Sequence, residues 1–145
     1  MMKKAVIILI LLAILFGGGM VINDRMKYTT YGEEIASLFD EDEIIDKINI
    51  SNRFEKYSFI IEDEEIIKKV LEVPFNMELK EKYEYERMYY DISFDTNKNS
   101  FIAISVGKNV LHMDRDYNHI YKIVGDNILY RLIKDLDEEY KSNND

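Results

Sequence analysis

The chain of 145 residues carries 28 acidic and 19 basic side chains, which gives it a formal net charge of −9 at neutral pH. Such a field repels nucleic acids and anionic lipid headgroups, so we expect no nucleic-acid partner and favour cationic partners or divalent ions. The sequence has no cysteine, which excludes disulfides, thiolate metal sites, a cysteine nucleophile and a thioether-linked lipid anchor.

The first element in the chain is an apolar segment with a basic start. Lys3 and Lys4 precede an uncharged run over residues 5–22. As a helix with a rise of about 1.5 Å per residue, this run covers about 27 Å, close to the roughly 30 Å hydrocarbon core of a bilayer. We therefore predict a transmembrane anchor over residues 1–26, which holds the rest of the chain outside the cytoplasm on the cell membrane. The alternative is a cleaved export signal and a secreted domain, because residues 17–19 are glycines that a signal peptidase tolerates.

A linker is expected to follow the anchor. Residues 27–43 show no clear period and end in an acidic run, so we interpret them as juxtamembrane, with a short helix at 33–39. A single folded domain is then expected over residues 44–141, and a disordered tail over residues 142–145.

Alternation of apolar and polar residues predicts two strands at the start of the domain, over 44–51 and 57–61, joined as a hairpin. Asp63 then caps a helix with an apolar stripe, and Pro74 ends it. The charged segment 76–86 is ambiguous.

Three further strands are expected to form a meander, over 88–94, 100–106 and 110–113. A polar loop and a short apolar segment at 120–124 lead to the last helix, which Asp126 caps. The order β-β-α-β-β-β-α predicts an α+β fold, in which an antiparallel sheet has both helices on one face.

Four stretches of the domain also carry a resemblance: residues 44–50, the run F-I-I-E-D-E-E-I-I-K-K-V-L at 59–71, residues 90–94, and residues 120–123 with the following helix L-Y-x-L-I-K. They resemble a loose family of small exported proteins of unknown function from low-GC Gram-positive bacteria, which are membrane-anchored or lipoprotein-like. The resemblance implies an exported, anchored domain and no activity. Many members use a lipidated cysteine, and this chain departs from them because it has none.

Alternating tyrosines and an arginine form the most suggestive surface feature. If residues 83–94 are extended, Tyr83, Tyr85, Arg87 and Tyr89 share one face of a strand. Tyrosine and arginine dominate the hot spots of protein interfaces, so these four residues are our candidate partner-binding site. The alternative is that tyrosine merely favours strands, and that this face packs under a loop or is simply exposed.

A candidate calcium loop lies further along the chain. Asp114, Asp116 and Asn118 match the first three ligand positions of such a loop. The glycine required next is His119, and the bidentate glutamate of the twelfth position is Gly125, so the turn and part of the shell are missing. We favour the alternative of an ordinary Asp/Asn-rich turn.

Catalytic motifs are missing from the sequence. His112 and His119 are the two histidines and do not have zinc-ligand spacing, and the chain contains neither a nucleophile elbow nor a phosphate-binding loop. We therefore expect no cofactor and no catalytic residue. The sequence predicts a non-catalytic binding or inhibitory module that acts on a protein of the cell envelope. A passive structural or calcium-responsive envelope domain is the alternative, followed by an enzyme that acts on the cell wall.

Overall fold

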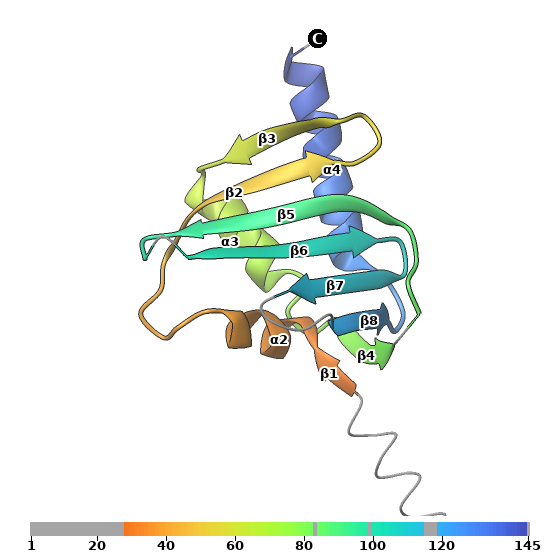
Figure 1. Ribbon diagram of the computed structural model, residues 1–145. Coiled ribbons are helices and arrows are strands. Elements are labelled where there is room, and N and C mark those ends of the chain that lie inside the picture. Colours follow the sequence, from red (N-terminus) through yellow and green to blue (C-terminus); the bar gives the residue numbers. More distant parts are fainter. Residues whose placement is uncertain (1–27, 83, 99, 115–118, 145) are drawn as a thin grey trace, which may run out of the picture.

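An antiparallel sheet forms one layer of the domain and helices form the other (Figure 1). The computed structural model describes residues 28–82, 84–98, 100–114 and 119–144. These residues form eight strands in the order β1-β4-β8-β7-β6-β5-β2-β3, with every neighbouring pair antiparallel. The strands are β1 (Tyr28–Thr30), β2 (Ile45–Asn52), β3 (Tyr57–Ile61), β4 (Glu78–Lys82), β5 (Met88–Thr96), β6 (Phe101–Gly107), β7 (Val110–Asp114) and β8 (His119–Ile123). The helices are α2 (Tyr31–Leu38), α3 (Glu64–Glu72) and α4 (Ile128–Asn144).

The alternation of side chains along the central strands decides which face of the sheet is buried. Every second residue of β5 is buried from Met88 to Thr96. Ile50, Ile92 and Ile104 lie directly opposite one another across β2, β5 and β6 and are almost fully buried. Because the side-chain period of a strand is two, a register slip of one residue would turn this rung to solvent.

All three helices bury their apolar sides against this face of the sheet, in one continuous core. Asp63 begins α3 as predicted, because its Oδ1 accepts hydrogen bonds from the backbone N–H groups of Glu65 and Ile66, at 2.9 and 3.1 Å. Val70 of α3 and Ile133 of α4 are fully buried. Figure 1 shows both helices behind the sheet.

The predicted α+β class with an antiparallel sheet is confirmed, but the number of elements differs from the prediction. The described residues contain three strands that we did not predict, namely β1, β4 and β8, whereas α2 overlaps the short helix that we expected at 33–39. β4 contains a single buried apolar residue, Leu79, among charged neighbours, so the sequence offers no alternation there. These strands are defined by their pairing with one another and with β7.

The segment expected to be a linker belongs to the folded structure from Tyr28 onward. Thr30 and Glu33 form a reciprocal capping box at the start of α2, which begins two residues before the helix that we expected. Tyr31 is fully buried, and its backbone N–H donates to the carbonyl of Met77 at 2.9 Å. At the other end, α4 continues through Asn144, over residues that we expected to form a tail.

The predicted anchor falls on residues 1–26, which lie outside the described part of the chain. Among the residues that are described, no helix is long and apolar enough to cross a membrane.

Candidate functional site

The predicted Tyr/Arg face is not formed as a single strand face. Tyr83 lies outside the described residues, and Tyr85 and Arg87 precede β5. Tyr85 is 64% exposed. The guanidinium carbon of Arg87 lies 4.1 Å from the centre of the Phe54 ring, and this ring lies 5.0 Å from that of Tyr89. Arg87 and Tyr89 therefore pack against the β2–β3 hairpin.

Tyr89 lies at the border of the core, near the start of β5. The register between β5 and β6 shifts between Met88 and Tyr90. Tyr89 and Tyr90 both contact the ring of Tyr130 on α4, with ring centres 5.7 and 5.9 Å apart. Burial still alternates here, with Tyr90 buried and Tyr89 half-buried, as the side-chain period of a strand requires. The ring of Tyr89 is therefore partly covered by Phe54 and Tyr130.

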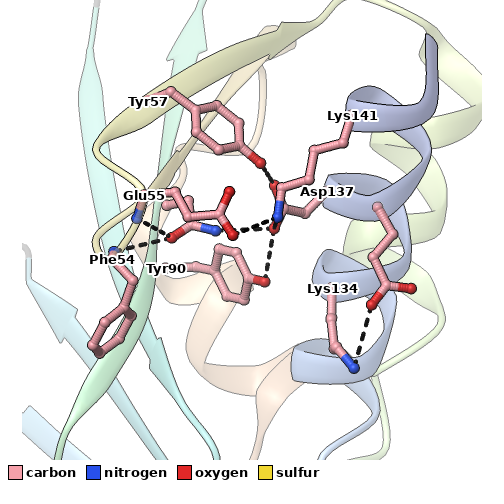
Figure 2. Close-up of polar contacts among 9 residues, drawn as sticks. Phe54, Glu55, Tyr57, Tyr90, Lys134, Asp137 and Lys141 are labelled. Atoms are coloured by element: carbon pink, nitrogen blue, oxygen red, sulfur yellow. Dashed lines mark hydrogen bonds and ion pairs between the residues drawn. The ribbon is translucent and has the colours of Figure 1, made fainter. Parts of the chain in front are cut away.

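A buried carboxylate, which we did not single out in the sequence, is the centre of the most connected polar cluster (Figure 2). Asp137 on α4 is 2% exposed. Its Oδ2 accepts hydrogen bonds from Asn52 Nδ2 and from the Tyr90 hydroxyl, each at 3.0 Å, and its Oδ1 accepts one from the Tyr57 hydroxyl. The ammonium of Lys141, one turn further along α4, lies 3.5 Å from Oδ2. We call these five residues the Asp137 clasp.

The electrostatics of the clasp keep the groups around Asp137 protonated. Burial and the hydrogen bond to Asp137 raise the pKa of Tyr57 to about 12. Burial, and then the charge of Asp137, raise the pKa of Tyr90 above its usual range. A hydrogen bond to Glu55, at 2.7 Å, raises the pKa of Lys141. Asp137 accepts three hydrogen bonds and has the ammonium of Lys141 nearby, so the clasp ties α4 to β2, β3 and β5.

A pocket of about 320 Å³ opens beside the clasp. Phe54 and Tyr89 line it, and so do Lys134 and Glu138, which pair with each other at 3.3 Å. Each charged group that lines this pocket has a partner within the chain, since Lys141 lies near both Glu55 and Asp137. One sequence signal could have revealed the clasp: Asp137 stands on the apolar stripe of α4, one turn after Ile133, where an uncompensated charge would be costly.

A larger hollow lies between α2 and α3 and encloses about 670 Å³. We call it the α2–α3 groove. Its apolar lining is contributed by both helices, by the segment that leads into β2 and by the residue that follows Pro74: Ile35, Ala36, Phe39, Ile44, Ile45, Ile67, Leu71 and Phe75. Ile44 is 63% exposed and Phe75 is 49% exposed, so this lining reaches the surface.

The two helices meet closely at one end of the groove. The backbone N–H of Gly32 donates to the carbonyl of Phe75 at 2.9 Å. A Cβ atom at position 32 would lie 2.4 Å from a carbon of the Phe75 ring, so this approach requires glycine. At the other end, the ring of Phe39 meets that of Phe94 edge-on, with centres 5.7 Å apart. The groove is thus built by contacts that join α2 to α3 and to the sheet.

Carboxylates surround this apolar surface. Five of the described residues that line the groove are acidic and one is basic. The basic residue, Lys68, lies 3.9 Å from Glu72. The acidic residues are Glu43, Asp46, Glu62, Glu64 and Glu72. The groove therefore combines an apolar floor with a negative rim.

The predicted calcium site stays a prediction, because most of it lies outside the described part of the chain. Asp116 and Asn118 lie outside the described residues, and Asp114 ends β7 opposite Ala103. His119 forms a 3.5 Å contact with Glu81. In the described ranges, no group of three or more His, Asp or Glu side chains gathers in a way that could hold a metal ion.

Comparisons of the chain with protein-family models, with curated proteins and with solved structures find no match. The Asp137 clasp holds elements of the chain together, whereas the α2–α3 groove presents apolar surface to the outside.

Proposed function

We propose that this protein is a membrane-anchored binding module of the cell envelope, which holds a segment of another envelope protein outside the cytoplasm. The anchor is the apolar run over residues 5–22, and the binding surface is the α2–α3 groove. The proposal includes an inhibitory role, in which the bound segment is kept from its other partners.

The observation that carries this proposal is the exposed apolar lining of the groove. Ile44 and Phe75 are large apolar residues that leave about half or more of their surface in water. Burial of such a side chain contributes about 1.5–3 kcal/mol, and exposed apolar surface rimmed by polar residues is typical of interaction sites. A partner that covers both residues would therefore gain affinity from surface that the domain itself leaves uncovered.

The polar groups that are best placed for chemistry are already in use, which supports a non-catalytic role. The oxygens of Asp137 accept hydrogen bonds from Asn52, Tyr57 and Tyr90, and the side chain is 2% exposed, so the carboxylate is enclosed by its own chain. The enzyme alternative would require a different acid or base. The passive structural alternative leaves the exposure of the groove without a role.

Photocrosslinking in cells tests the proposal with the full-length chain. A photoreactive residue replaces one position at a time. Ala36 and Lys68 line the groove, and Tyr85 belongs to the surface predicted from the sequence. Lys122, on the open face of the sheet, is the control. We expect one discrete crosslinked protein from the two groove positions and none from Lys122. The same pattern from all four positions, or no crosslink from the groove, would refute the proposal. A discrete product from Tyr85 alone would move the binding site to the surface predicted from the sequence.

A further inference from the structure

We propose that the α2–α3 groove takes a cationic amphipathic helix of its partner protein, with the apolar side of that helix on the groove floor and its lysine or arginine residues at the acidic rim. This inference rests on the proposed function and specifies the chemistry of the bound segment.

The position of the groove favours a helix over an extended peptide. Extended peptides bind by adding a strand to a free sheet edge. Next to the groove, β2 extends only from Ile45 to Lys47 beyond its pairing with β3, which begins at Ile48. The register shift between Ile45 and Lys47 interrupts this short edge, so it is a poor template for an added strand. A helix satisfies its own backbone hydrogen bonds and needs only apolar contact. The groove offers that contact through Ile35 and Phe39 on one side and Ile67 and Leu71 on the other.

The length of the groove walls sets the length of the segment that they can cover. Ile35 and Phe39 are four residues apart on or just after α2, and Ile67 and Leu71 are four residues apart on α3. Each pair therefore spans about one helical turn, about 5.4 Å. α3 has nine residues and is about 13 Å long at about 1.5 Å per residue. A partner segment of two to three turns would therefore extend along the groove.

The negative charge of the rim favours a partner segment of positive charge. Asp46, Glu62, Glu64 and Glu72 are exposed, and Glu43 is half-buried. The one ammonium among the described lining residues already lies near Glu72. Like charges that face each other across an interface weaken a complex, whereas opposite charges raise the rate of association. An anionic helix or a fatty acid would therefore meet repulsion at the groove that a cationic helix does not.

Two rim residues allow a direct test of the charge. Asp46 and Glu62 line the groove and are exposed, so both can be reversed to lysine without the loss of a buried contact. Asp135 and Glu139 are exposed residues of α4 outside the groove lining, and the variant D135K/E139K changes the net charge by the same amount. The two double variants therefore differ in the position of the charges and not in their number.

The experiment uses the full-length chain in nanodiscs of neutral lipid. Because the chain has no cysteine, Ala36→Cys provides a single thiol in the groove for an environment-sensitive fluorophore, and Lys122→Cys provides the control position. The probes are three synthetic peptides of about 18 residues, or five turns: an amphipathic Leu/Lys helix, its Leu/Glu counterpart, and a Leu/Lys peptide of scrambled order. Empty nanodiscs report binding to lipid.

We expect a saturable shift in fluorescence at position 36 with the amphipathic Leu/Lys peptide, and not with the other two. Its affinity should fall as salt is raised from about 50 to about 500 mM, because the rim charges are exposed. D46K/E62K should lower the affinity about tenfold, and D135K/E139K by less than about twofold.

Three results would overturn the inference: no saturable shift at position 36, equal binding of the scrambled or Leu/Glu peptide, or equal loss in the two double variants. The proposed function fails separately. A discrete crosslinked protein from the groove in cells, together with failure of the Leu/Lys peptide, would leave a binding module whose partner has another chemistry. Specific peptide binding without any crosslink from the groove would overturn the function.

Discussion

Removal of the Asp137 carboxylate should be among the most destabilising single changes in this domain. Asp137→Ala deprives three donors of their acceptor. Two of them belong to buried residues, Asn52 at 6% and Tyr90 at 5% exposure. Each buried donor left without a partner costs about 1–3 kcal/mol. Tyr57 is half-buried and recovers part of its loss by bonding to water, and Lys141 keeps Glu55.

We therefore expect Asp137→Ala to lower the free energy of unfolding by about 2–6 kcal/mol. The assay is guanidinium denaturation of residues 28–145, with the slope of the transition compared between variants to confirm that both unfold alike. Asp135→Ala is the matched control, because Asp135 is an exposed acid on the same helix. Its effect should stay within about 0.5 kcal/mol.

The same reasoning predicts how a second substitution behaves. Tyr90→Phe removes one donor and leaves the carboxylate with its other partners, so it should cost about 0.5–1.5 kcal/mol. In the Asp137→Ala background the same change should cost less, because that donor is already unsatisfied.

A loss below about 1 kcal/mol for Asp137→Ala, or a loss equal to that of Asp135→Ala, would refute the view that the clasp fastens α4 to the sheet.

Three further outcomes are expected. The folded-state pKa of Tyr57 is raised from 10.0 to about 12, so its contribution to stability is complete below pH 10 and is lost as the pH rises from about 10 to about 12. Tyr57→Phe should therefore make the free energy of unfolding less dependent on pH in that range. An unchanged dependence of this free energy on pH would contradict the prediction. Ile133→Ala should lower the free energy of unfolding by about 2–5 kcal/mol because Ile133 is fully buried, and Leu132→Ala should lower it by less because Leu132 is partly buried. Chemical denaturation compares the two variants, and a larger loss for Leu132→Ala would mean that the core-facing side of α4 is misassigned. Protease added to intact protoplasts should remove the folded domain, whereas full protection, or release of the domain into the medium, would argue against a tether outside the membrane.

Local pattern in the sequence was enough to predict the centre of the fold. The strands around Ile50, Ile92 and Ile104 alternate because one face is buried and the other is not, and that period is visible in the residues themselves. The start of α3 was equally clear, because the side chain of Asp63 accepts from N–H groups only two and three residues away. Such features depend on neighbours in the chain.

The short outer strands could not be predicted because their structure depends on pairing with distant residues. Leu79 is the one buried apolar residue of β4, which is a strand because β1 and β8 flank it. Thr30 and Glu33 did have the spacing of a capping box, but the sequence alone did not show that Tyr31 would be buried and that the helix would begin there.

Both candidate sites arise from tertiary structure. The hydroxyls of Tyr57 and Tyr90 lie 80 and 47 residues from Asp137 along the chain, so no local pattern links them. The α2–α3 groove likewise joins two helices that are separated by the β2–β3 hairpin. The sequence by itself determined which residues are apolar, which are charged and how they alternate. The packing of distant elements decided which apolar residues were left at the surface and which carboxylates came to surround them, because burial is a property of the assembled chain.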